Sequence, residues 1–267
     1  MTEAHAIDRA AGYLAKAQRP DGSWADADPF VCARATYALK AAGGPGEVRD
    51  AGIGCLERLQ GDDGRFPAKS GMYTDAACTA YALVVLNKFS YSKASLPASR
   101  GILWLLEHQN ADGSWSGRNT QKNAYTTSLC LRALHAYHLD GIERYRKGVA
   151  LVLDKLAGPD FFDGPVSHVY APVLNLRRIG QLPAAAIDAF LHFADDRAID
   201  AVHEGRIADI AYLAGTLDAL GEVETRDICR EFLADVQNDD GGFGKESGGA
   251  SDPNWTALVV LALTGSL

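Results

Sequence analysis

The chain has 267 residues, of which 47% are hydrophobic and 22% charged, and its 34 acidic and 26 basic side chains give a net charge of −8. The length suits one large domain, which we expect to span residues 1–267, with the composition of a soluble globular protein. The acidic balance argues against nucleic-acid binding, no apolar stretch is long enough to span a membrane, and the acidic, amphipathic start is unlike a secretory signal, so we expect a cytoplasmic protein.

In chain order, amphipathic and apolar segments alternate. Residues 6–18 place apolar side chains every three or four positions with charges on the opposite face, as in a surface helix. Residues 31–43 carry few charges and much alanine, which indicates a buried helix. The two patterns recur, with amphipathic segments at 51–60, 101–109 and 230–237 and buried ones at 74–89, 126–137, 168–180, 206–221 and 253–265. Since no segment alternates as a strand does, the sequence predicts an all-α protein.

A short motif links the two kinds of segment: glutamine, two residues, Asp-Gly, one residue and an aromatic. It reads QRPDGSW at 18–24, QGDDGRF at 60–66, QNADGSW at 109–115 and QNDDGGF at 237–243. The distance between the last two motif glutamines, Gln109 and Gln237, is about three times the distance between the earlier ones. We therefore predict two degenerate copies of the motif between them, with turns near Gly164 and near Asp195–Asp196. Asp-Gly ends a helix by allowing positive φ. We expect the glutamine and the aromatic to hold neighbouring repeats together rather than to act in catalysis.

Six helix pairs predict a single α6/α6 barrel, with buried helices in an inner ring and exposed helices in an outer ring. A linear solenoid of helix pairs is the alternative. The apolar last segment favours closure, because an open end would need a polar cap. In a barrel the inner helices run parallel, so their N-termini gather at one mouth, where helix dipoles favour negative charge. The central cavity must be filled by side chains or by a ligand.

The motif at the end of an outer helix resembles the QW motif of squalene–hopene cyclases and related terpene cyclases. The wider superfamily of α/α barrels includes class II diterpene cyclases and protein prenyltransferase β subunits. Through its six repeats the resemblance covers nearly the whole chain. It implies an isomerase or lyase of natural product biosynthesis that takes a small hydrophobic or isoprenoid substrate. The full cyclases have two barrels and this chain has length for one, which leaves a face open to a partner or to self-association.

The catalytic signature of class II cyclases is Asp-x-Asp-Asp-Thr-Ala at the start of an inner helix. The matching segment here is Asp75-Ala76-Ala77-Cys78-Thr79-Ala80, so the motif is degenerate: Ala77 stands where that family has its protonating aspartate. The zinc ligands of the prenyltransferase branch are also unmatched, since Trp255 stands at the histidine position and no cysteine follows Asp209 by two residues. We therefore expect no catalytic zinc and no cofactor.

Three residues are candidates for acid–base chemistry: Asp75, Asp209 and His168. Asp75 opens an inner helix, as an N-cap or as an acid whose pKa is raised by desolvation. Asp209 is a charge in an apolar helix, and Arg206, three residues earlier, is its expected salt-bridge partner. His168 begins the fourth inner helix, either as a structural residue or as the base that ends a carbocation reaction by removing a proton.

The substrate-binding candidates lie on inner helices, most of them near the helix starts. Aromatic faces can stabilise the cations that terpene chemistry requires, or can serve only as core packing. Asp252 can be an N-cap, and Arg34 can bind an anionic end of a substrate or lie at the rim. The candidates are Arg34, Tyr73, Tyr125, Tyr170, Tyr212, Trp255 and Asp252.

Three functions are open from the sequence. The first is a terpene-cyclase-like enzyme that cyclises or isomerises an isoprenoid or similar polyunsaturated substrate through acid–base and carbocation chemistry in a central cavity. The second is a non-catalytic barrel that binds a hydrophobic ligand. The third is a cyclase or lyase that acts on another natural-product intermediate.

Overall fold

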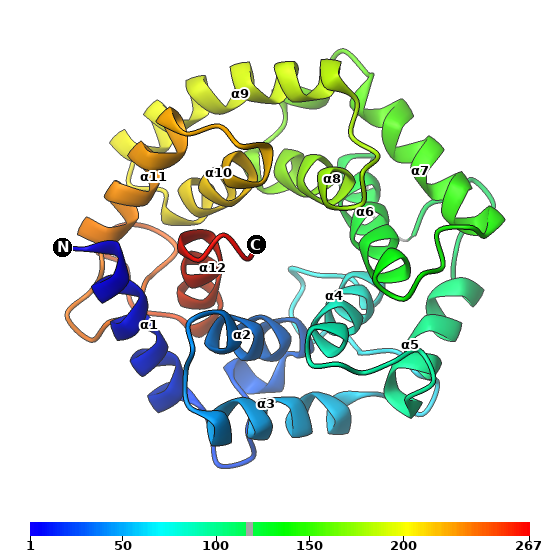
Figure 1. Cartoon of the computed structure of the whole chain (residues 1–267), viewed down its shortest axis with the longest axis horizontal. Coiled ribbons are helices and arrows are strands. Elements are labelled where there is room, and N and C mark those ends of the chain that lie inside the picture. Colours follow the sequence, from blue (N-terminus) through cyan, green and yellow to red (C-terminus); the bar gives the residue numbers. More distant parts are fainter. Residues whose placement is uncertain (116–119) are drawn as a thin grey trace.

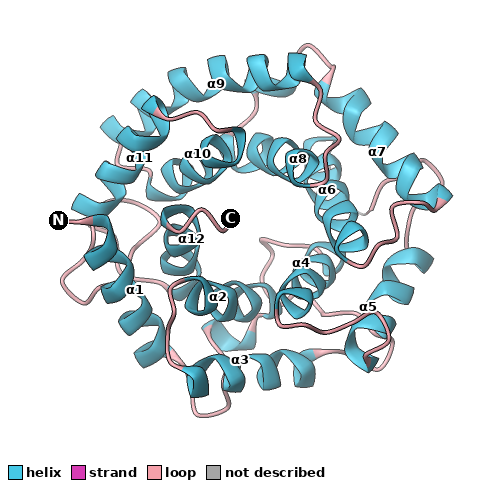
Figure 2. Cartoon of the chain, in the orientation of Figure 1, coloured by secondary structure: helices cyan, strands magenta, loops and turns pink. Residues whose placement is uncertain are grey.

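The computed structural model describes residues 1–115 and 120–267, and the regular secondary structure of this part is entirely helical (Figure 2). Helices alternate between an outer and an inner ring (Figure 1). The outer helices are α1 (Glu3–Ala17), α3 (Gly46–Leu59), α5 (Leu96–Glu107), α7 (Glu143–Leu156), α9 (Ala184–His203) and α11 (Glu224–Asp235). The inner helices are α2 (Pro29–Ala41), α4 (Asp75–Lys88), α6 (Thr120–Ala136), α8 (Val166–Arg178), α10 (Ile207–Leu220) and α12 (Pro253–Leu263). Two 3₁₀ turns, η1 (Ala25–Ala27) and η2 (Phe161–Asp163), precede α2 and α8.

The two rings close on themselves. Each inner helix packs against the inner helices before and after it, and α12 packs against α2 to complete the circle (Figure 1). In the outer ring the first helix, α1, contacts the last, α11. The predicted α6/α6 barrel is therefore confirmed, and the linear solenoid is excluded because its first and last repeats would not touch.

Burial follows the contrast between the two kinds of segment. Every residue of α4 from Ala76 to Leu86 is buried, and α10 and α12 are buried along most of their length. An outer helix such as α7 buries only one stripe, which includes Tyr145, Val149 and Val152. The five cysteines are buried free thiols, as expected of core residues.

The repeated glutamines join consecutive outer helices. Gln60 Nε2 donates to the carbonyl oxygen of Gly64 in its own turn at 2.8 Å and to that of Pro97 in the first turn of α5 at 2.9 Å. Gln237 makes the same kind of bond to the carbonyl oxygen of Ala6 in α1 at 2.8 Å. The same glutamine bond therefore links consecutive outer helices and also joins the last repeat to the first. The other two glutamines reach Val48 and Arg144 in the same way.

The main chain at the aromatic position of the motif binds the inner helix, and where the residue is tryptophan its indole N–H also binds the outer helix. Trp115 Nε1 donates to the carbonyl oxygen of Leu105 at 2.7 Å, and its backbone N–H donates to Thr127 Oγ1 on α6 at 3.1 Å. In the second repeat the Phe66 N–H donates to Thr79 Oγ1 at 2.9 Å. The predicted structural role of the motif is thus confirmed, and the Thr79 hydroxyl has a structural partner of its own.

One of the two predicted degenerate turns is in place and the other was misplaced. Gly164 lies between η2 and α8, as predicted. Asp195–Asp196 lie inside α9, which continues without a break to His203, and the turn comes at Gly205, whose φ is +65°. Asp195 and Asp196 look like turn residues in the sequence, but they lie on the exposed face of a long helix. The helix ends just before Gly205, the glycine that follows it.

Candidate functional site

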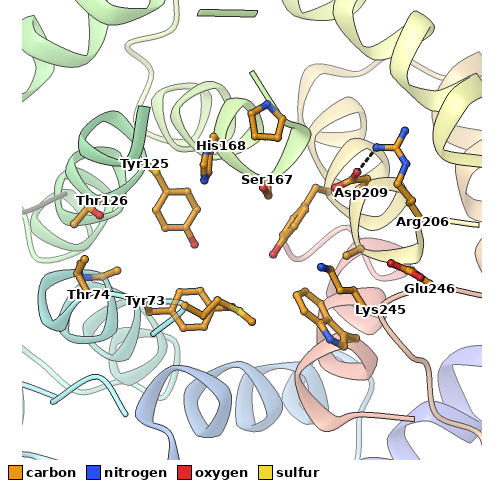
Figure 3. Close-up of a pocket in the computed structure, with 16 residues that line it drawn as sticks. Tyr73, Thr74, Tyr125, Thr126, Ser167, His168, Arg206, Asp209, Lys245 and Glu246 are labelled. Atoms are coloured by element: carbon orange, nitrogen blue, oxygen red, sulfur yellow. Dashed lines mark hydrogen bonds and ion pairs between the residues drawn. The ribbon is translucent and has the colours of Figure 1, made fainter. Parts of the chain in front are cut away.

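The N-terminal ends of the inner helices surround a cavity of about 400 Å³ at one mouth of the barrel (Figure 3). A volume of this size suits a small-molecule ligand. Residues at or near the starts of α4, α6, α8, α10 and α12 line it, because parallel inner helices bring those starts together. Four predicted substrate-binding residues are among them: Tyr73, Tyr125, Tyr212 and Trp255.

The aromatic walls are backed by a second layer of rings. Tyr212 stacks on Tyr170 with ring centroids 3.9 Å apart, and Tyr170 meets Tyr125 edge-on at 6.1 Å. Tyr73 stacks on Phe30 at 3.7 Å. Tyr170 therefore supports the wall from behind and is not among the residues that line the cavity. Stacked neighbours fix the orientation of the lining rings, so their faces and edges are preorganised toward whatever occupies the cavity.

Burial keeps three of the phenols in and behind this wall neutral. Burial raises the pKa of Tyr73, of Tyr125 and of Tyr170 above the ordinary value for tyrosine. A neutral phenol presents a π face and a hydroxyl group but no charge. The wall therefore attracts a cation only through its ring quadrupoles, an interaction of about 0.5–2 kcal/mol for each well-placed ring.

Arg34 lies behind the wall rather than at the rim, and it is 1% exposed. Its Nη1 donates to Asn254 Oδ1 on α12 at 2.9 Å and to the Tyr73 hydroxyl at 3.5 Å, and the guanidinium lies 4.7 Å from the Phe30 ring centroid. These contacts join α2 to α12 and hold Tyr73. Arg34 does not line the cavity, so it does not contact a ligand there directly.

Asp209 supplies a carboxyl group to the cavity from the first turn of α10, and its side chain is 20% exposed. Arg206 Nη1 donates to Asp209 Oδ2 at 2.7 Å, the salt bridge that the sequence predicts (Figure 3). Burial raises the pKa of Asp209 above the ordinary value, and the contact with Arg206 and the charge of Lys245 act against this rise. Because the net direction is upward, the protonated acid is favoured relative to a carboxyl group in water.

His168 lies in the first turn of α8 and lines the same cavity, beside Ser167 (Figure 3). Two of the three predicted acid–base residues, Asp209 and His168, therefore share one cavity and come from adjacent inner helices. Thr126 on α6 adds a hydroxyl group. The arrangement combines apolar aromatic area with a few polar groups, as expected of a small-molecule site.

Asp75, the third predicted acid–base residue, lies outside this cavity. Arg65 Nη1 donates to its Oδ2 at 2.9 Å, and the Ala68 N–H donates to its Oδ1 at 2.7 Å. The N-cap of α4 is Thr74, whose hydroxyl accepts from the Ala77 N–H at 3.2 Å, so Asp75 is not the cap either. Asp75 instead fastens the loop that precedes α4.

Asp252 is the N-cap of α12, which is one of the two roles that the sequence predicts for it. Its Oδ1 accepts from the Asn254 N–H at 2.8 Å and from the Trp255 N–H at 3.3 Å, which caps α12. An N-cap of this kind stabilises a helix by about 1 kcal/mol. Asp252 does not line the cavity but fixes the helix start from which Trp255 reaches it.

Ala77, the residue aligned with the protonating aspartate of class II cyclases, lines the cavity. The start of α4 thus presents this position to the cavity, but here it carries a methyl group. Cys78, the next position, is fully buried in the core. A methyl group cannot donate a proton, so this position of α4 supplies no acid to the cavity.

Sequence reasoning did not find Lys245 and Glu246, which line the cavity from the loop between α11 and α12 (Figure 3). Two main-chain bonds place this loop: the Ser247 N–H donates to the Gly205 carbonyl oxygen at 2.7 Å, and the Ala208 N–H donates to that of Lys245 at 3.2 Å. Its only sequence signal is a polar, glycine-rich stretch after the last motif.

Within residues 1–115 and 120–267, no group of three or more histidine, cysteine, aspartate or glutamate side chains is placed to hold a metal ion. In the same part of the chain no helix has both the length and the apolarity needed to cross a membrane.

Comparisons with known proteins agree with this fold. The family model of the squalene–hopene cyclase C-terminal domain matches residues 69–171. Drimenyl diphosphate synthase from Streptomyces showdoensis is 29% identical over 126 residues, which are 43% of this chain and 24% of that protein. The match thus spans about a quarter of the length of this curated relative.

Solved structures match over nearly the whole chain. A protein from Actinoplanes has a TM-score of 0.71 at 17% identity, with 99% of each chain covered. The type II terpene cyclase MstE from Scytonema, in complex with its product merosterolic acid A, has a TM-score of 0.64 at 14% identity, with 99% of this chain and 96% of that chain covered. The chain therefore has the α/α-barrel fold of the type II terpene cyclases, and residues 69–171 are similar to the squalene–hopene cyclase C-terminal domain.

Proposed function

We propose that this protein is a terpene-cyclase-like enzyme that protonates an isoprenoid or similar polyunsaturated chain and cyclises or isomerises it in the cavity at the N-terminal mouth. The observation that carries the proposal is the union of aromatic walls and a partly buried carboxyl group in one cavity of about 400 Å³. Apolar walls fold a hydrocarbon chain, an acid starts the reaction, and aromatic faces stabilise the cation that forms.

In the proposed reaction the protonated carboxyl group of Asp209 transfers its proton to one carbon of a substrate double bond. The other carbon becomes cationic, and a second double bond attacks it to close a ring. The final cation loses a neighbouring proton to His168, which leaves a new double bond. One proton enters and one leaves, so the product is an isomer of the substrate. Solvent then returns a proton to Asp209 and removes one from His168.

Asp209 takes this role because the family position on α4 is Ala77. The raised pKa of Asp209 favours the protonated form that proton donation requires, relative to a carboxyl group in water. Arg206 opposes that form by stabilising the carboxylate. A bound apolar chain would exclude water from the cavity and raise the pKa of Asp209 further, so substrate binding itself would prepare the acid.

The substrate class rests on what similar proteins are named for. The curated relative is a drimenyl diphosphate synthase, and the Scytonema cyclase has also been solved with geranylgeranyl dihydroxybenzoate as substrate. Both names indicate chains built from isoprene units, and the aromatic cavity of this chain suits such a chain.

The direct test is to incubate the purified protein with farnesyl diphosphate, geranylgeranyl diphosphate and squalene and to analyse extracted products by gas chromatography. We expect a cyclic product, and a fall in kcat of about 10²–10⁴-fold on Asp209→Asn, the usual contribution of a general acid. Asp196→Asn, which changes an exposed aspartate on α9, controls for the loss of one carboxylate. Loss of turnover on Asp75→Asn but not on Asp209→Asn would move the acid to α4 and refute our assignment.

A second function, a carrier for a hydrophobic ligand, has one observation in its favour. The position of the family acid is an alanine, and the nearby aspartate is held in an ion pair. A carrier would co-purify with a bound lipid, detectable by native mass spectrometry after solvent extraction, and would return it unchanged after incubation. It would also keep its ligand in Asp209→Asn.

A further inference from the structure

The opposite end of the barrel has a cavity of its own, of about 310 Å³, where the inner helices end. Four basic side chains line it: Lys88 at the end of α4, Arg132 and His135 from α6, and Arg178 at the end of α8. None of the described residues that line it is acidic. In a chain with a net charge of −8, this is a local concentration of positive charge.

The ends of helices explain only part of this charge. Basic residues in a last helical turn offset the partial negative charge of the helix C-terminus, and Lys88 and Arg178 are in such turns. Arg132 is four residues before the end of α6: its Nη1 donates to Asn175 Oδ1 at 3.3 Å, and its Nη2 donates to the oxygen of Leu267, the last residue of the sequence, at 3.2 Å. No aspartate or glutamate side chain of the described residues forms an ion pair with Arg132.

The basic groups also act on one another. Burial lowers the pKa of Lys88, and the charges of Arg132 and Arg178 lower it further. Burial likewise lowers the pKa of Arg132, and Arg178 adds to the effect. One carboxylate, Asp218, lies beside Gly265 at the edge of the cavity, but it faces Arg226 and Arg230 at 3.5 Å. No aspartate or glutamate side chain of the described part of the chain therefore forms an ion pair with Lys88, Arg132 or Arg178.

We propose that this cavity is a binding site for a small anion of the phosphate class, either inorganic phosphate or diphosphate. Lys88, Arg132 and Arg178 come from three different helices around it, so an anion there would receive charge-assisted hydrogen bonds from several sides. Guanidinium groups match the geometry of phosphate oxygens, and the ammonium group of Lys88 adds a movable point charge. The site is distinct from the aromatic cavity, and the proposal does not depend on the proposed cyclase activity.

The test is calorimetric titration of the full chain with phosphate and, separately, with diphosphate, against sodium chloride at matched ionic strength. We expect saturable binding of at least one of the two anions and none of chloride. Lys88→Ala and Arg178→Ala change exposed residues, and each should weaken binding by about tenfold or more, since a hydrogen bond between charged groups contributes about that factor. Arg132→Gln should weaken it at least as much.

Lys16→Ala is the matched control, because Lys16 is also an exposed lysine in a last helical turn but lies on α1. It should leave binding unchanged. Equal affinity in all variants, or no saturable binding at millimolar anion, would overturn the proposal. So would binding that is lost on Lys245→Ala instead, because the anion would then be at the mouth with the aromatic cavity. Binding to vesicles that contain phosphatidic acid, without binding of either free anion, would also overturn the proposal. The basic residues would then contact a membrane surface instead of a small anion.

Discussion

The replacement of Gly64 by alanine should destabilise the barrel strongly, because the motif glycine meets two constraints at once. Its φ is +93°, where an L residue costs about 1–2 kcal/mol. A Cβ there would lie 2.5 Å from the carbonyl oxygen of Arg100 and 2.8 Å from its carbon. Both atoms belong to the main chain of α5 and cannot turn aside, so crowding adds about 1–3 kcal/mol. We therefore expect Gly64→Ala to lower the free energy of unfolding by about 2–5 kcal/mol.

Gly12→Ala is its matched control and should have the opposite sign. Gly12 is exposed inside α1, and a Cβ there would meet no atom within 4 Å. Alanine in a helix is more stable than glycine by about 0.5–1 kcal/mol. Urea unfolding followed by circular dichroism measures both changes. A Gly64→Ala variant within 0.5 kcal/mol of the unchanged protein (on the order of the expected error) would refute the reading of the motif as a close contact between repeats.

Three further predictions concern the ring and the acid. Gln237→Leu removes two hydrogen bonds, one of which closes the ring onto α1, and should cost about 1–3 kcal/mol in urea unfolding; an unchanged midpoint would show that the bond is dispensable. Trp115→Phe keeps an aromatic side chain but removes the indole N–H, so the buried Leu105 carbonyl oxygen loses its donor. The free energy of unfolding should fall by about 1–3 kcal/mol by the same measurement. Arg206→Gln removes the cation that holds the pKa of Asp209 down, so that pKa should rise and the decline of kcat/KM with increasing pH should move to higher pH; an unmoved or lowered profile would contradict the assignment of the acid.

The fold could be predicted from the sequence because the features that determine it recur in most of the repeats. Each pair shows the same contrast between a striped and an apolar helix, and the glutamine, glycine and aromatic recur at fixed spacing, so each copy strengthened the interpretation of the others. The salt bridge between Arg206 and Asp209 was also predictable, since residues three apart on a helix share a face. The misplaced turn at Asp195–Asp196 lay in a repeat that lacks the motif.

The site was less predictable because it depends on how each helix is rotated. Asp75 and Ala77 are two positions apart on α4, which places them on nearly opposite faces of the helix, and the cavity receives Ala77. The sequence cannot fix that rotation, since both faces of this segment meet other parts of the protein. Lys245 and Glu246 were missed for a different reason: a loop brings them to the cavity through main-chain bonds to the turn before α10, and such bonds leave no side-chain pattern.

The central claim is that a proton from the protein starts the reaction. Turnover in deuterium oxide tests it most directly, because the Asp209 carboxyl proton exchanges with solvent before it is transferred. We predict a cyclic product that carries one deuterium on carbon, by mass spectrometry, and the loss of this product in Asp209→Asn. A cyclic product without deuterium would mean that protonation does not start the reaction, and a labelled product that persists at full rate in Asp209→Asn would mean that another group donates the proton.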